Sequence, residues 1–197
     1  MSAATRERII EAGSALFRRQ GYAGTGLKAI AAESGAPIGS IYHFFPGGKD
    51  ALSDAVIRAA GRAYGALIPL FFDGAPDVTQ ATRNAFSGAA QTLRASGYAD
   101  ACPIAAVALE VASTNETLRE ATAAVFGHWV DLLAERYAAA GLDAEAAHDL
   151  AMAFVVNLVG AFMLARAQRD ARIVERAGEM VAGAVQAALV SVQTRAA

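Results

Sequence analysis

The sequence predicts an all-α protein in which a small N-terminal helix-turn-helix head of three helices precedes a larger helical body, about nine helices in all. Apolar residues recur at helical spacing along almost all of the 197 residues, and no convincing strand or internal repeat appears. Residues 21–50 have the pattern of a helix-turn-helix. With 55% hydrophobic residues and a mean hydropathy of +0.32, the chain can bury a sizeable core.

The first helix is amphipathic and both of its ends carry suitable residues. Its apolar face consists of Ile9, Ala12, Leu16 and Phe17. Glu7 lies in the first turn, Arg18 and Arg19 lie in the last, and Gly21 follows directly, so that each suits the helix dipole or a helix cap.

Two short helices follow, separated by a tight turn. The first of them ends at Gly35, where glycine can adopt the left-handed conformation that such a turn needs. Pro37 restarts the chain, and the next helix, Ile38–Phe44, is too short to be held by its own hydrogen bonds. It must therefore pack against the head, and the spacing predicts an inner face with Ile41 and Phe45. The side chains expected to point outward are Ser40, Tyr42 and His43.

The outward Tyr42 and His43, taken alone, would be ordinary surface side chains. Their neighbours favour a second interpretation, because Gly39 and Ser40 allow another surface to approach closely. Hydroxyl, phenol and imidazole groups can donate to phosphate oxygens or base edges. Lys49 opens the next helix, where its ammonium could neutralise a phosphate. The segment therefore indicates contact with DNA.

The rest of the chain is expected to form a body of long helices. A linking helix runs from about Lys49 to Phe71, with a kink at Pro69, and Gly74 and Pro76 mark the loop after it. Further helices are expected over 78–96, 103–113, 116–139, 144–169 and 172–194. This organisation divides the chain into a DNA-binding domain, residues 1–47, and a ligand-binding and dimerisation domain, residues 48–197.

The motifs of this chain resemble those of TetR-type transcriptional repressors, and within them the LmrA/YxaF-like branch. The resemblance rests on TRERIIEAGSALFRRQGY, GTGLKAIAAESGAP and GSIYHFFPGGKDAL in the head, and on ACPIAAVALE and LARAQRD in the body. It is specific over residues 5–55 and looser afterwards. It implies a repressor that binds a palindromic double-stranded DNA operator as a homodimer and is released by a small hydrophobic or aromatic effector.

The resemblance also assigns the residues that would meet DNA. Phosphate or base contacts are implied for Thr25, Lys28, Ser40, Tyr42, His43 and Lys49. With the start of the second helix and the entrance of the third, the candidate DNA-binding set becomes Thr25, Gly26, Lys28, Ile38, Gly39, Ser40, Tyr42, His43 and Lys49. Branch members often have Arg or Lys where this chain has Ile38. Either operator binding is weaker here, or Ile38 makes an apolar contact such as one with a thymine methyl.

The last two helices are the ones expected to pair between subunits. Gly160, Ala161 and Ala165 permit close helix approach, and residues 173–185 carry a broad apolar stripe. These stripes could instead pack within one subunit, although the apolar arcs look wider than one face needs. A twofold dimer would present two heads to the half-sites of an operator.

The body also carries candidates for an effector pocket. Apolar rings, thioethers and a few polar groups are typical of such sites, and the candidate ligand-binding residues are Phe86, Cys102, Glu110, Phe126, Trp129, Met152 and Asn157. For any single aromatic or methionine, core packing is the more frequent role. Asn157 and Glu110 are more suggestive, since a buried polar group left unsatisfied costs about 1–3 kcal/mol and so each needs a partner.

Several other functions find little support. His43, His128 and His148 lack metal-ligand spacing, and neither a nucleophile elbow nor a phosphate loop occurs, so no enzyme, metal or cofactor is expected. Cys102 is the single cysteine, which excludes an intrachain disulfide and suits the cytoplasm. No signal peptide is recognised, and the apolar run 151–165 is shorter than the ~20 residues of a membrane span, so we expect a buried helix and no membrane contact.

The charge distribution is uneven, with a formal net charge of −2 and a pI near 5.9 for the whole chain. Residues 1–50 hold six Lys or Arg against four acids, which suits a small, localised DNA footprint but not nonspecific binding. The alternative function is a helical sensor or carrier of apolar ligands whose head binds a protein partner. DNA binding must weaken steeply with salt, and apolar ligand binding should not.

Overall fold

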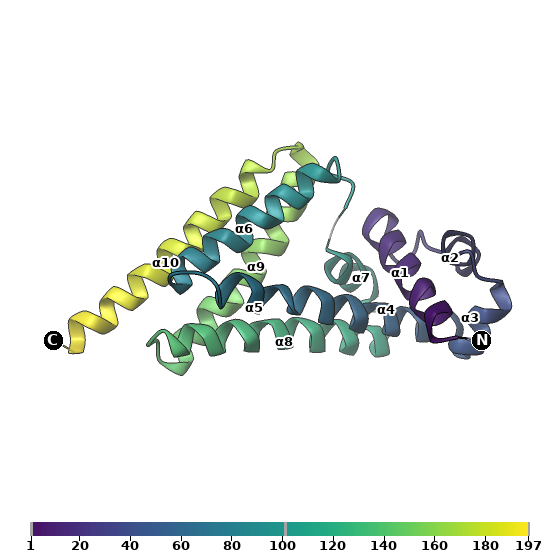
Figure 1. Ribbon diagram of the computed structural model, residues 1–197, viewed down its shortest axis with the longest axis horizontal. Helices are drawn as coiled ribbons and strands as arrows, with labels where there is room; N and C mark the ends of the chain where they lie inside the picture. The colour runs from purple at the N-terminus through teal and green to yellow at the C-terminus, as the bar shows by residue number, and fades with distance from the viewer. Residues whose placement is uncertain (1, 101, 197) are drawn as a thin grey trace. The chain divides into compact units, whose positions relative to one another are not determined.

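The computed structural model describes residues 2–100 and 102–196, and for 195 and 196 the backbone only. This part of the chain forms ten α-helices and no strand, so the all-α prediction is confirmed (Figure 1). The helices are α1 (Ala3–Gln20), α2 (Leu27–Ser34), α3 (Ile38–Phe44), α4 (Gly48–Gly65), α5 (Leu67–Phe72), α6 (Val78–Ala95), α7 (Pro103–Val111), α8 (Glu116–Ala139), α9 (Ala144–Gln168) and α10 (Arg172–Ala196).

The chain divides into two compact units, each of which is described by itself. Unit 1 comprises Met1–Ala63 and Ala101–Val125, and unit 2 comprises Tyr64–Asp100 and Phe126–Ala197. Helices α4 and α8 each begin in unit 1 and end in unit 2. The boundary predicted at residue 47 coincides with the start of α4, and unit 1 extends past it to include α7.

Unit 1 contains the head, which consists of α1, α2 and α3. These helices pack on one another, and α1 also packs on α7 (Figure 1). Ile9, Phe17 and Ile30 are fully buried in this core. Gly35 ends α2 with φ 63° and ψ 20°, which is the left-handed cap that the sequence predicts for the turn before α3.

The predicted linking helix is interrupted at Ala66, where α4 ends and α5 begins. Pro69 explains the position of the break. Its ring nitrogen has no hydrogen to donate to the carbonyl of Gly65 one turn earlier, and the ring crowds that carbonyl. The other predicted body helices are confirmed, with ends that differ by two residues at most.

The core of unit 2 lies among α6, α9 and α10, which pack on one another, with α5 against α6. Phe86 and Phe154 meet edge to face, with ring centroids 4.8 Å apart. Tyr137 is fully buried, and its hydroxyl lies 2.9 Å from Thr82 Oγ1. Since Thr82 also donates to the carbonyl of Val78, the Tyr137 hydroxyl serves as donor in the buried pair. Burial raises the pKa of Tyr137 to about 12.

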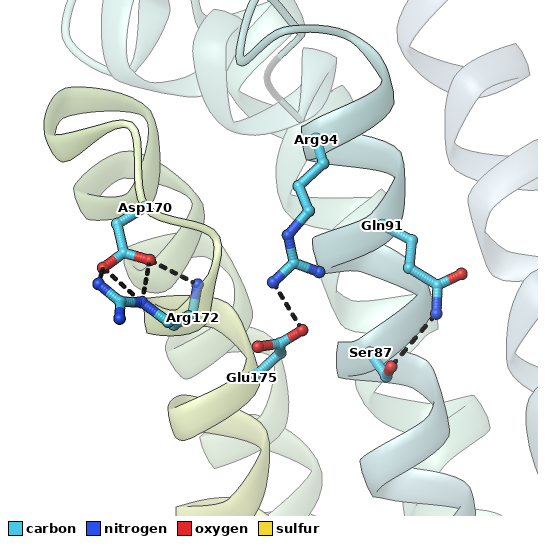
Figure 2. A network of polar contacts seen from close by, with 6 residues as sticks. All are labelled: Ser87, Gln91, Arg94, Asp170, Arg172 and Glu175. Atoms are coloured by element: carbon cyan, nitrogen blue, oxygen red, sulfur yellow. Dashed lines mark hydrogen bonds and ion pairs between the residues drawn. The ribbon is translucent and has the colours of Figure 1, made fainter.

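Polar contacts mark the edge of this core, where α10 begins beside the end of α6 (Figure 2). Arg94 of α6 pairs with Glu175 of α10 at 2.8 Å. Asp170 accepts hydrogen bonds from the side chain and the backbone amide of Arg172, and these bonds hold the pKa of Asp170 at about 2. Exposed pairs of this kind stabilise a fold only slightly.

Helix α9 is less buried than the sequence predicts. Its most apolar 18-residue window has a mean hydropathy of 1.9, yet only 22% of that window is buried, so the expectation of a buried helix is wrong for one face. By length and composition alone, α9 and the α4–α5 segment could each cross a membrane. The exposed apolar side chains of α9 are Met152, Val156, Met163 and Leu164, and those of α10 are Met180 and Val190.

Candidate nucleic-acid interface

The outer face of α3 is the candidate DNA-binding surface. On its inner face Ile41 is fully buried and Phe45, just past the helix, is 3% exposed, as the sequence predicts. Tyr42 is 55% exposed and Ile38 41%. The exposed face of α3 consists of Ile38, Gly39, Tyr42 and His43. The head therefore anchors this short helix from one side and leaves a phenol, an imidazole and an apolar side chain available on the other.

Ser40 is not part of this face, and the expectation that it points outward is wrong. It is 4% exposed and lies beside Ile41 on the buried arc. Adjacent helical residues are separated by only about 100° around the axis. A helix that buries Ile41 and Phe45 therefore turns the small side chain at position 40 inward as well.

Thr25 is fully buried in the turn between α1 and α2. Its hydroxyl donates to the carbonyl oxygen of Gly21 at 2.7 Å and accepts from Gln20 Nε2 at 3.4 Å. This hydroxyl closes the turn and is not presented to solvent, in contrast to the predicted DNA contact. Gly26 and Lys28, at the start of α2, are exposed.

Lys49 opens α4, but its ammonium is directed into the head. Nζ donates to the carbonyl oxygen of Tyr22 at 2.8 Å and lies 3.9 Å from the centroid of the Tyr22 ring. Burial lowers the pKa of Lys49, and the nearby charges of Glu110 and Asp50 oppose this effect. The residue that was expected to neutralise a phosphate therefore joins α4 to the turn after α1.

This lysine belongs to a group of five residues that we call the Tyr22 junction: Tyr22, Lys49, Asp50, Glu110 and Asn115. The Glu110 carboxylate accepts from the backbone N–H groups of Tyr22 at 2.9 Å and Ala23 at 2.6 Å. The Tyr22 hydroxyl donates to Asp50 at 2.7 Å, and Asn115 Nδ2 donates to the other Asp50 oxygen at 2.9 Å. Burial, followed by the hydrogen bond to Asp50, raises the pKa of Tyr22 to about 12.

Sequence reasoning missed Tyr22, Asp50 and Asn115 as members of this junction. No local pattern identifies them, because their partners lie 27 to 88 residues away along the chain. Glu110 was singled out as a polar group that needs a partner, and the structure provides that partner in the head.

The other residues predicted for an effector pocket are distributed over both units. In unit 2, Phe86 belongs to the core, Phe126 and Trp129 stack edge to face at 5.6 Å, and Met152 is 46% exposed. Asn157 donates from Nδ2 to the carbonyl of Ala153, one turn earlier in its own helix, at 2.8 Å. Cys102 precedes α7 in unit 1, and burial raises the pKa of its thiol, which disfavours the reactive thiolate.

No metal centre is built into the part of the chain that the structure describes. Over residues 2–100 and 102–196, no group of three or more His, Cys, Asp or Glu side chains is placed to hold an ion.

Two family profiles match the chain. Residues 9–67 match the profile described as "Bacterial regulatory proteins, tetR family". Residues 78–180 match "Transcriptional regulator LmrA/YxaF-like, C-terminal domain". The first match covers the helix-turn-helix, and the second covers most of the helical body.

Relatives with similar sequences are named as transcriptional regulators. An HTH-type transcriptional regulator of Mycobacterium tuberculosis strain H37Rv is 35% identical over 170 residues, which cover 84% of this chain and 86% of the relative. YxaF of Bacillus subtilis strain 168 is 32% identical, with 84% and 87% covered. LmrA of the same strain is 28% identical, with 81% and 85% covered.

Solved structures share the fold. The regulatory protein TetR from Rhodobacter sphaeroides superposes with a TM-score of 0.82 at 22% identity, over 92% of this chain and 99% of that one. A TetR transcriptional regulator from Chloroflexus aurantiacus has a TM-score of 0.78 at 27% identity, over 93% and 94%. The arrangement of helices described above is thus one that other regulators share.

Proposed function

We propose a repressor mechanism for this chain, which belongs to the TetR family of bacterial transcriptional regulators and to its LmrA/YxaF-like branch. Members of this family regulate transcription and are not enzymes. The proposal is that two copies bind a palindromic operator through their heads and leave it when a small hydrophobic or aromatic effector binds. The observation that supports this proposal most directly is that α3 is packed into the head by its inner face and exposed on its outer face.

In the proposed complex, α3 lies in the major groove. Tyr42 and His43 donate to phosphate oxygens or base edges, and Gly39 lets the groove wall approach the backbone. Ile38, at 41% exposure, is placed for an apolar contact with a thymine methyl. Lys28 and the free amides at the start of α2 supply contacts to a phosphate. Because Thr25, Ser40 and Lys49 make contacts inside the head, their proposed contribution is to hold these groups in place.

The proposed dimer uses the exposed apolar faces of α9 and α10. Met152, Val156 and Met163 follow one another at helical spacing on one side of α9. On α10 the exposed residues include Met180, Gly183, Ala184, Ala187 and Val190. Large side chains alternating with small ones allow two helices to approach closely, and a twofold axis would bury both faces at once. Two heads related by that axis would read half-sites about 34 Å apart, one helical turn of DNA.

Release requires an effector that prefers the conformation unable to bind DNA, because a ligand with equal affinity for both conformations shifts nothing. We propose that it binds among the aromatic side chains of the body, such as Phe126 and Trp129, and tilts α4. A hydrophobic ligand suits these rings. The proposed location of the protein is the cytoplasm, where its DNA target lies and where the single cysteine stays reduced.

The test is fluorescence anisotropy of labelled DNA from the region upstream of the chain's own gene. The protein is titrated at two salt concentrations, with unrelated DNA as competitor. We expect competitor-resistant binding that weakens steeply with salt, as phosphate contacts require. Hydrophobic and aromatic compounds added to the complex then identify the effector by the fall in anisotropy.

Binding without preference over competitor DNA, in this fragment and in a selection from genomic fragments, would contradict the operator proposal. A head that binds no DNA at low salt would instead favour a sensor that acts through a protein partner.

A further inference from the structure

We propose that Glu110 is a positioning residue for operator binding: its carboxylate holds the turn between α1 and α2 and thereby fixes the recognition helix relative to α7. This inference rests on the proposed DNA-binding function. It means that the Tyr22 junction determines the orientation in which the head presents α3 to DNA.

The first support is the geometry of the carboxylate. Both oxygens are used, one by the N–H of Tyr22 and the other by the N–H of Ala23. Two successive backbone N–H groups form a small concave anion site, and in this molecule a side chain from α7 occupies it. The contact joins residues 87 and 88 positions apart in the sequence.

The second support is Gly21, which ends α1. Its φ of 74° is one that residues with a side chain rarely adopt. A Cβ at this position would overlap the Glu110 carboxylate. The backbone at the end of α1 is therefore shaped so that a carboxylate can reach the two amides beyond it.

The third support is the continuation of the junction to α4. Lys49 Nζ donates to the carbonyl of Tyr22, whose N–H donates to Glu110. The backbone of Tyr22 therefore contacts an acidic side chain of α7 and a basic side chain of α4. Asp50, the next residue of α4, binds the Tyr22 hydroxyl and Asn115. Any displacement of α7 relative to α4 must strain this turn, and Thr25 inside the same turn leads directly into α2.

The direction of the change in DNA affinity distinguishes this inference from an effect of charge alone. DNA is a polyanion, so removing an acid from a DNA-binding unit should strengthen binding through electrostatics alone. If Glu110 positions the head, removing its charge should weaken specific binding instead. Glu120 offers a matched control in the same unit, since its side chain is 66% exposed and it lies 4.0 Å from its ion-pair partner Arg119.

The experiment compares Glu110→Gln, Glu110→Ala and Glu120→Gln with the full-length wild-type protein on the operator fragment and on unrelated DNA. We expect operator affinity to fall about tenfold in Glu110→Gln and further in Glu110→Ala, which loses both acceptors. Affinity for unrelated DNA should stay the same or rise slightly, because removing an acid favours binding to a polyanion. The dependence of operator binding on salt should stay unchanged, because no phosphate contact is lost. Glu120→Gln should bind the operator as tightly as the wild type or more tightly.

Hydrogen exchange of the Tyr22 and Ala23 amides provides a measurement without DNA. Both amides should exchange about tenfold faster or more in Glu110→Ala while the melting temperature changes little. Wild-type exchange rates in this variant, or operator affinity of Glu110→Gln equal to that of Glu120→Gln, would overturn the inference and leave the proposed function standing. If a Glu110 variant contained fewer active molecules but those molecules bound the operator with wild-type affinity, Glu110 would have a role in folding only. That result would also overturn the inference. If the wild-type protein itself showed no specific DNA binding, both the positioning role of Glu110 and the proposed function would be contradicted.

Discussion

Tyr42 is the residue whose substitution most directly tests the recognition face. Its side chain is 55% exposed, and its hydroxyl has no hydrogen-bond partner among the residues that the structure describes. We expect Tyr42→Ala to weaken operator binding by about 1–3 kcal/mol, roughly tenfold to a hundredfold. Fluorescence anisotropy on the operator fragment measures this change.

The melting temperature and the dimer should be unaffected by Tyr42→Ala, because exposed substitutions usually change stability by less than about 0.5 kcal/mol. Tyr42→Phe distinguishes the contribution of the hydroxyl from that of the ring. If it lowers operator affinity as much as Tyr42→Ala does, the hydroxyl makes the contact. A variant that unfolds would show instead that Tyr42 holds α3 in place.

Tyr137 makes stability depend on pH in the alkaline range. The folded protein holds the phenol proton more tightly than the unfolded chain, because burial raises the pKa of Tyr137 to about 12 from about 10 in the unfolded chain. The contribution of Tyr137 to the free energy of unfolding should therefore be constant below pH 10 and fall by about 2–3 kcal/mol toward pH 12. Denaturant titrations at several pH values measure it.

In Tyr137→Phe that alkaline loss should shrink, leaving the part due to Tyr22, whose pKa is also raised to about 12. At neutral pH the variant should lose about 1 kcal/mol, since the bond to Thr82 disappears while Thr82 still donates to Val78. An unchanged alkaline profile in Tyr137→Phe would show that other groups govern the transition.

Candidate residues in the head could be predicted from the sequence only in part. Periodicity correctly separated Ile41 and Phe45 from Tyr42 and His43, because the first two are apolar and four residues apart while the other two carry polar groups. Small hydroxyl residues carry no such signal. Thr25 and Ser40 fit either side of a helix or turn, and the structure buries both. The partner of Glu110 depends on the tertiary fold, which no local pattern encodes.

The packing of α10 on α6 depends on Gly178. A Cβ at this position would lie 2.5 Å from the Cβ of Phe86, an atom that cannot move without the backbone of α6. Gly178→Ala should therefore force the two helices apart and lower stability by about 1–3 kcal/mol. In a domain of this size, each kcal/mol lowers the melting temperature by about 2–4 °C, which thermal unfolding can detect.

Gly127 of α8 is the matched control, because a Cβ there would meet no atom within 4 Å. Gly127→Ala should keep or raise the melting temperature, since alanine favours a helix over glycine by up to about 1 kcal/mol. If both variants behave alike, helix propensity and not the contact with Phe86 determines the outcome.

Helix positions were the most predictable part of the fold. Capping residues such as Gly35 and the start at Pro103 marked several ends directly. The interruption at Ala66 was predicted as a kink farther along, at Pro69, because the missing hydrogen bond acts one turn before the proline. The wide apolar arcs of the last two helices indicated a second packing surface, but the α9 side chains that stay exposed could not be predicted, since an apolar helix has the same composition whether its partner is the same chain or another copy.

The proposed dimer would form through the apolar faces of α9 and α10. Val156 is 63% exposed and Met180 is 72% exposed, so a charge at either site leaves the folding core of one subunit intact. Val156→Glu and Met180→Glu would bury carboxylates against apolar surface in the dimer, and we expect both variants to be monomers by light scattering. Operator affinity should fall by about a hundredfold or more, because one head contacts one half-site.

Ala123→Glu adds the same charge to an exposed position of another helix, α8. It should remain a dimer with nearly wild-type operator affinity. A monomeric Ala123→Glu variant, or dimeric Val156→Glu and Met180→Glu variants, would place the subunit interface elsewhere on the body.

The contact between Glu110 and the head is made with main-chain groups, and this has a consequence for how such regulators diversify. Every residue except proline provides the backbone N–H groups at positions 22 and 23, so the only side chain that the Glu110 carboxylate excludes is one at Gly21. A different head with glycine after its first helix could therefore keep this contact with Glu110, although the side chains of α1 that pack on α7 would still have to fit. Recombination, or a designed chimaera that exchanges residues 1–63, would then preserve this one main-chain contact between a new head and the existing α7.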